Sequence, residues 1–225
     1  MPIFRVLGRG FDSRHLQRMN KKLGVYSSLL VFFSVLAFAL CMLFDLQSGD
    51  DLIWKYGSYL SCIFLALGFI PMICSYVSFV EPKNKAAGMA ALSFSIIYGI
   101  LVVIVYFTQL TTVRLTNLSE ETARLLDFSQ FNLFFNYDLL GYAFMALSTF
   151  FIGIQLEPTN RKDKVLKYLL VIHGIFAISC FIMPMMGVFK SNMEGGDIIG
   201  TIILEFWCIY FMPVSILSYK HFKEK

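Results

Sequence analysis

Six long apolar stretches, whose connections carry Lys and Arg on alternate sides, constrain the fold of this chain more than any other feature. The stretches cover about residues 24–44, 57–79, 86–107, 139–156, 165–189 and 198–219. Each is close to the ~20 residues that a helix needs to cross a ~30 Å hydrocarbon core. With 57% hydrophobic residues and 24 Phe, the chain also has too little polar surface to cover a soluble globule. The sequence therefore predicts an all-α fold, a polytopic bundle of six transmembrane helices.

Basic residues predict the orientation of this bundle. Fifteen of the 19 Lys and Arg residues lie at the two ends of the chain or on connections on the same side as those ends. The four on the opposite side are Lys55, Arg114, Arg124 and Lys190. Short loops that flank membrane spans keep their Lys and Arg in the cytoplasm. We therefore expect cytoplasmic N- and C-termini.

The first 18 residues carry an unusual pattern. Gly10-Phe11-Asp12-Ser13 back-translates to GGN-TTC-GAY-TCN, which resembles the T-arm consensus of a transfer RNA gene, and Met19 is followed by a run that is typical of a bacterial start. We interpret residues 1–18 as a mis-annotated, non-native extension and residues 19–225 as the transmembrane domain. The alternative is a basic amphipathic arm on the membrane surface.

Several function classes lack support in the sequence. The basic residues are spread over short loops, whereas nucleic-acid binding needs a concentrated patch, so no nucleic-acid partner is expected. The five cysteines all lie in predicted spans and show no CxxC or Cys/His spacing, which argues against disulfides and a zinc site. No HExxH, GxSxG, paired-carboxylate or phosphate-loop signature is present. We therefore name no catalytic residue, metal or cofactor, and an enzyme is the least supported class.

A short pattern occurs twice, at the ends of the second and fourth spans. Glu81-Pro82-Lys83-Asn84-Lys85 and Glu157-Pro158-Thr159-Asn160-Arg161 share the order Glu-Pro-x-Asn-basic, and Tyr98-Gly99 and His173-Gly174 follow at similar distances. This register predicts two related hairpins, the second span with the third and the fourth with the fifth. The alternative is that Pro, Asn and basic residues simply suit such turns.

The Glu-Pro turns, together with two further segments, carry a family resemblance. The exit of the third span, Tyr106-Phe107-Thr108-Gln109-Leu110-Thr111-Thr112-Val113, and the segment Asp138-Leu139-Leu140-Gly141-Tyr142 resemble parts of uncharacterised multi-span bacterial membrane proteins, known as domains of unknown function. The resemblance covers about residues 60–160. It implies a bacterial cytoplasmic membrane but no reaction and no functional residue.

Ionisable residues inside the predicted spans are the candidates for a site, because a charge in the membrane is costly. Glu205 lies about 10 Å from the outer end of its span and His173 about 12 Å from the inner end of its own, at 1.5 Å per residue. The remaining axial gap is about 8 Å in a ~30 Å core, so the two side chains could pair directly or through water. Together with Tyr98 and Asp138 they form the predicted ligand or proton site. The alternative is a single buried hydrogen bond that holds the sixth span in place.

The longest connection, residues 108–138, is predicted to be extracytoplasmic. Ser119, followed by Glu120 and Glu121, predicts a short interfacial helix over 119–128. The aromatic and polar residues that follow suit either a cap over a pocket or a membrane anchor.

These features favour an integral membrane protein that binds or transports a small molecule or ion in a cavity of the bundle. The alternative is a non-catalytic scaffold or regulatory subunit that acts through protein contacts. Lipid is the expected surrounding, with a homo-oligomer or another membrane protein as the partners left open.

Overall fold

A computed structural model describes residues 13–48, 52–189 and 196–225. Most of the predicted 1–18 extension therefore lies outside the described residues. The described part of that segment, from Ser13 onward, is continuous with the first helix.

The described residues are helical, without strands, and contain six helical segments that are long and apolar enough to cross a membrane; one of these, Arg161–Met185, consists of α6 and α7 together. In chain order the elements are α1 (Ser13–Ser48), α2 (Leu52–Ser78), a 3-10 turn (Pro82–Asn84), α3 (Lys85–Thr108), a π-helical turn (Gln109–Val113), α4 (Glu120–Leu126), a second 3-10 turn (Phe128–Gln130), α5 (Leu133–Gln155), α6 (Arg161–His173), α7 (Ile175–Met185) and α8 (Gly196–Glu224).

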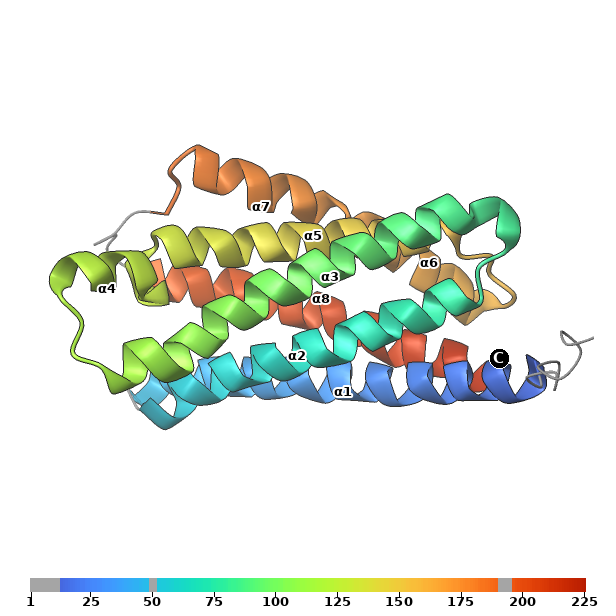
Figure 1. The fold of residues 1–225 in the computed structure, drawn as a ribbon, viewed down its shortest axis with the longest axis horizontal. Coiled ribbons are helices and arrows are strands. Elements are labelled where there is room, and N and C mark those ends of the chain that lie inside the picture. Colours follow the sequence, from blue (N-terminus) through green and yellow to red (C-terminus); the bar gives the residue numbers. More distant parts are fainter. Residues whose placement is uncertain (1–12, 49–51, 190–195) are drawn as a thin grey trace, which may run out of the picture.

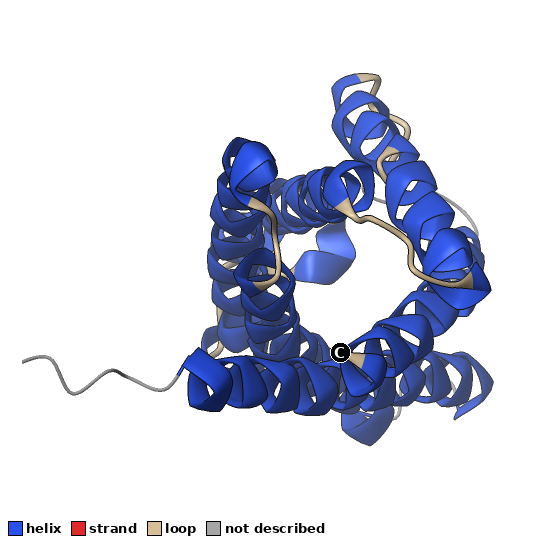
Figure 2. Ribbon diagram, turned by 90° about the vertical axis from the view of Figure 1, so that its right-hand side faces the viewer, coloured by secondary structure: helices blue, strands red, loops and turns tan. Residues whose placement is uncertain are grey.

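The long helices form a closed ring (Figures 1 and 2). Around the ring the helices follow one another in the order α1, α2, α3, α5, α6 and α8, each in contact with the next, and α8 contacts α1 to close the ring. We call the end that holds the start of α1 and the end of α8 the terminal end, and the opposite end, where α4 lies, the distal end (Figure 1). Antiparallel neighbours place the α2–α3 and α5–α6 turns together at the terminal end.

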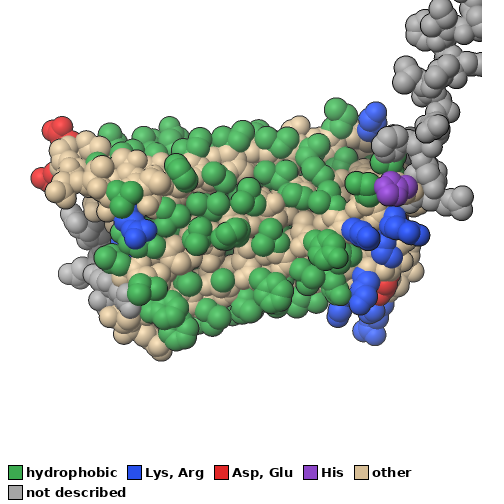
Figure 3. All heavy atoms as spheres, turned by 60° about the horizontal axis from the view of Figure 1, so that its bottom comes forward, with side chains coloured by type: hydrophobic (Ala, Val, Ile, Leu, Met, Phe, Trp, Pro, Cys, Tyr) green, Lys and Arg blue, Asp and Glu red, His purple; other side chains and the backbone are tan. Residues whose placement is uncertain are grey.

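The outside of this ring is apolar along most of its length. Figure 3 shows hydrophobic side chains over the middle of the molecule and Lys and Arg side chains gathered at the terminal end. Because water would disfavour such an apolar belt, the six helices indicate a membrane-embedded protein.

The predicted fifth span, residues 165–189, is divided into α6 and α7 at Gly174. A Cβ at this position would lie 2.9 Å from the Phe150 ring on α5, so a glycine is needed for this close approach. Glycine also favours helix less than other residues do. Pro184 lies inside α7, away from this break.

The region before the fourth span differs from the prediction in one respect. The short helix predicted over 119–128 is confirmed as α4, with the Ser119 side chain accepting a hydrogen bond from the Thr122 amide. However, α5 begins at Leu133, so Asp138, which the sequence assigned to the loop, lies inside a helix and is 3% exposed. The aromatic residues before Asp138 add apolar surface to the first turns of the helix, so α5 begins about a turn and a half before the predicted start of the span at residue 139.

Candidate functional site

Asp138 is a carboxyl group buried in the distal half of the bundle. One oxygen, Oδ2, accepts a hydrogen bond from the Tyr106 hydroxyl of α3 at 3.1 Å. The other, Oδ1, is buried and has no hydrogen-bond partner among the described residues. An unpaired polar atom in an apolar interior is costly, so Asp138 is the side chain here that most needs a ligand or a proton.

Further polar groups surround this carboxyl. The Tyr98 hydroxyl is buried and has no hydrogen-bond partner in the described part of the chain, and the Tyr142 hydroxyl lies 3.7 Å from the Cys62 sulfur. Tyr98 and Tyr142 pack with their ring centroids 5.7 Å apart, and both lie within electrostatic range of Asp138. The structure therefore brings together the predicted Tyr98 and Asp138. It adds Tyr106, Tyr142 and Cys62, which sequence reasoning missed as site residues.

The segment between α3 and α5 covers this cluster. Gln109, in the π-helical turn, donates to the Leu126 carbonyl at 2.7 Å and accepts from the Phe128 amide at 3.1 Å. These bonds hold the Phe128 ring over Tyr106 and against Phe135, at centroid distances of 5.8 and 5.2 Å. This segment, which we call the cap, therefore lies over interior polar groups, and its role as the cover of a ligand pocket stays a prediction.

Aromatic side chains fill the middle of the ring of helices. Phe69, Tyr98, Tyr142, Trp207 and Phe211 contact one another in a closed circuit, with successive centroids 5.2, 5.7, 5.2, 5.0 and 6.4 Å apart. They come from α2, α3, α5 and α8. This aromatic layer separates the Asp138 cluster from the polar groups at the terminal end.

His173, another predicted site residue, is held on both sides of its ring. The Trp207 indole N–H donates to Nε2 at 3.0 Å, so this nitrogen carries no proton. Nδ1 must then carry it in the neutral ring, and it donates to Thr149 Oγ1 at 2.7 Å. With 1% exposure and both nitrogens occupied, His173 acts as a structural link between α5, α6 and α8.

Glu205, the last predicted site residue, is not brought to His173. Both ring nitrogens of His173 are occupied by Thr149 and Trp207, and Glu205 Oε1 is buried without a partner among the described residues. The spacing of residues predicts the axial positions of these side chains but not the direction in which each helix presents them. The four predicted residues therefore fall into separate places, with only Tyr98 and Asp138 in one cluster.

The terminal end contains a buried acid–histidine pair that the sequence analysis did not identify. Asp163 Oδ1 lies 2.8 Å from His221 Nδ1, and the two side chains are 4% and 2% exposed. Asp163 Oδ2 accepts from the Thr159 hydroxyl at 2.7 Å and the Thr159 amide at 3.2 Å. This network ties the α5–α6 turn to the end of α8. A sequence signal was available only for Asp163, as an acid in the first turn of a helix after Asn160.

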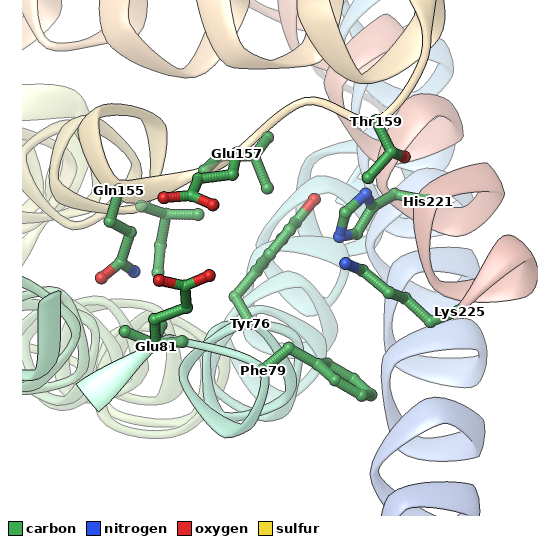
Figure 4. A pocket seen from close by; sticks show the side chains of 11 residues that line it. Tyr76, Phe79, Glu81, Gln155, Glu157, Thr159, His221 and Lys225 are labelled. Carbon is green, nitrogen blue, oxygen red and sulfur yellow. The ribbon is translucent and has the colours of Figure 1, made fainter. Parts of the chain in front are cut away.

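A cavity of about 230 Å³ lies beside this pair. Figure 4 shows Glu81, Glu157 and Gln155 at one side of it and His221 and Lys225 at the other. It is lined by Tyr76, Phe79, Val80, Glu81, Ile152, Gln155, Leu156, Glu157, Thr159, His221 and Lys225.

The two Glu-Pro turns meet at this cavity. Lys83 Nζ lies 3.0 Å from Glu81 and 2.9 Å from Glu157, so one ammonium group joins the turns. Hydrogen bonds to Glu157 and Glu81 raise the pKa of Lys83 to about 12, and the hydrogen bond from Lys83 lowers the pKa of Glu157. The proposed duplication of hairpins stays a prediction, but its two signature turns are spatial neighbours.

No protein-family model, curated protein or solved structure matches the chain. Among the described residues, no three His, Cys, Asp or Glu side chains are grouped so that they could hold a metal ion. The Asp138 cluster and the terminal cavity are therefore the two features of the described residues from which a function can be inferred.

Proposed function

We propose that this integral membrane protein binds a small ion or molecule inside its helix bundle, with Asp138 as the anchoring residue, and transports or senses it. Its termini face the cytoplasm of a bacterial cell, so the distal end and its cap face outward. The observation that carries the proposal is the buried carboxyl of Asp138, of which one oxygen has no hydrogen-bond partner within the residues that the structure describes.

The energetics favour a bound cation or proton at this position. A carboxylate at the centre of a membrane helix costs about 2.5–3.5 kcal/mol on insertion scales. One neutral hydrogen bond from Tyr106 offsets about 1 kcal/mol of that. A cation or proton at Oδ1 supplies the missing partner, and the hydroxyl of Tyr98 offers a further ligand atom.

The surroundings give such a ligand a route. The cap is fixed to α3 mainly through the Gln109 hydrogen bonds, so its displacement would open the Asp138 cluster toward the distal side. The aromatic layer blocks the way to the terminal end. A site that is closed on one side and capped on the other suits a transporter or sensor in an outward-occluded state.

Asp138→Asn tests this proposal, since the amide keeps the shape and can still accept from Tyr106 but loses the charge. We expect thermal unfolding of the detergent-purified full chain to depend on Na⁺, K⁺ or pH in the wild type and to lose that dependence in Asp138→Asn. Glu224→Gln is the matched control, because Glu224 is an exposed acid at the terminal end, where it is ion-paired with Lys162. Identical responses of the wild type and Asp138→Asn to every cation and to pH would refute binding at Asp138.

A second function, a non-catalytic scaffold, is favoured by the packing around His173. Thr149 and Trp207 satisfy its ring completely, and the aromatic layer leaves the centre of the ring of helices filled. A scaffold predicts that Asp138→Asn leaves ligand responses unchanged while the chain co-purifies with a fixed membrane partner.

A further inference from the structure

The cavity at the terminal end is bordered by an arrangement that already holds an ammonium group. Lys83 Nζ lies between Glu81 and Glu157 at 3.0 and 2.9 Å. Its side chain is 64% exposed, and those of the two glutamates are 52% and 57% exposed. Exposed ion pairs contribute little to stability because water screens them, so a competing cation can displace the lysine. The two carboxylates that hold Lys83 are therefore open to a competing ammonium group.

Other features of the cavity favour a cation that donates hydrogen bonds. Both amide atoms of Gln155 are buried without a partner among the described residues, and Gln155 lines the same side as Glu81 and Glu157 (Figure 4). The C-terminal ends of α2, α5 and α8 surround the space, and helix C-termini carry partial negative charge. The Gln155 carbonyl and the two carboxylates can together accept three N–H bonds.

The size and lining of the cavity narrow the class of ligand. A volume of about 230 Å³ is below the ~300–1,000 Å³ of pockets that hold drug-sized ligands, which suits a small ligand. Phe79, Val80, Ile152 and Leu156 add an apolar wall for carbon atoms. The described residues provide no group of three metal-ligating side chains, so an organic cation fits better than a divalent metal.

We propose that this pocket binds a small organic primary ammonium group, which lies between Glu81 and Glu157 in place of Lys83. A dissolved small amine and the ethanolamine headgroup of a phospholipid both present this chemistry at the membrane surface. The pocket is separate from the Asp138 site, because Gln155 lies about 25 Å further along α5 at 1.5 Å per residue.

The test uses the full chain purified in detergent, with butylamine as the probe. We expect butylamine to raise the unfolding temperature saturably, while 1-butanol and butyrate at the same concentration do not. Glu157→Gln should abolish this shift. Glu120→Gln, the matched control, removes an exposed glutamate that is ion-paired with Arg124 at the distal end and should keep the shift.

Lys83→Met supplies the decisive measurement, because it removes the internal competitor and keeps the length of the side chain. In the wild type, butylamine must displace the two ion pairs of Lys83, whereas in Lys83→Met these pairs are absent. We therefore expect the variant to bind butylamine about fivefold more tightly. A merely structural lysine predicts unchanged or weaker binding. The proposal is overturned if butylamine gives no shift, if Glu157→Gln keeps it, or if Lys83→Met fails to tighten it.

The source of the ammonium group is distinguished in lipid nanodiscs. Phosphatidylethanolamine and phosphatidylcholine differ in their primary and quaternary ammonium groups, and only the former can donate N–H bonds. Butylamine binding that is weaker in phosphatidylethanolamine discs identifies the headgroup as a competitor for the pocket. Equal butylamine binding in both discs identifies a dissolved amine as the ligand.

Discussion

Gly153→Ala probes the packing that positions His173. Gly153 and Thr149 lie four residues apart on the face of α5 that contacts α6. A Cβ at Gly153 would lie 2.8 Å from the Val171 backbone nitrogen and 3.0 Å from the Leu170 Cβ. A backbone nitrogen cannot rotate away, so α6 must shift as a whole, and overpacking of this kind costs about 1–3 kcal/mol.

Gly200→Ala isolates this packing cost. Gly200 is also helical, in α8, but a Cβ there would meet nothing within 4 Å. Replacing a helical glycine by alanine stabilises the helix by about 0.5–1 kcal/mol. Both variants have this stabilisation, so it cancels when their free energies of unfolding are compared. We therefore expect Gly200→Ala to raise the free energy of unfolding of the protein. The free energy of unfolding of Gly153→Ala should be about 1–3 kcal/mol lower than that of Gly200→Ala.

Thermal unfolding of both variants in the same detergent measures this difference. For a chain of this size, 1 kcal/mol corresponds to about 2–4 °C, which gives a separation of about 2–12 °C. Gly153→Ala should also move Thr149 away from His173. Equal unfolding temperatures for the two variants would refute the close approach of α5 and α6.

Two further predictions test the histidine and the surface ion pair. Trp207→Phe removes the hydrogen-bond donor to His173 Nε2 and should lower the free energy of unfolding by about 1 kcal/mol or more. Trp54→Phe, at the distal end, is the control and should lower it less. Equal losses for the two variants in chemical unfolding would contradict the assigned hydrogen bond. Because the folded pKa of Glu157 is lowered from 4.5, its pair with Lys83 stabilises above about pH 4.5 and is lost as pH falls through the lower folded value. The raised pKa of Lys83 extends that stabilisation upward until it is lost near pH 12. The effect of Lys83→Ala on the unfolding temperature should therefore be constant from about pH 6 to pH 9 and shrink in acid, and a strong change between pH 6 and 9 would show that another group is responsible.

The sequence predicted the candidate spans because their signal is local. A run of about 20 apolar residues is sufficient to cross a bilayer, whatever the rest of the chain does. The cap of α4 was also predictable, since Ser119 and the acids after it act within one turn. The break at Gly174 was missed, because it depends on the Phe150 ring of a different helix.

The candidate site was only partly predictable for a related reason. Hydropathy and spacing indicate the depth of a side chain along a helix, and on that basis they identified His173 and Glu205 as unusual. They do not fix the rotation of one helix against another, which decides whether two side chains meet. As a result, the expected pairing of His173 with Glu205 was replaced by hydrogen bonds to Thr149 and Trp207.

By itself, the sequence determined that this chain forms six apolar helices suited to a membrane, because length and composition act segment by segment. Only the tertiary structure decided which polar groups meet. It joined Tyr106 to Asp138 across 32 residues and Asp163 to His221 across 58. Such pairs depend on how the helices close into a ring, and that closure is a property of the packed side chains of all the helices together.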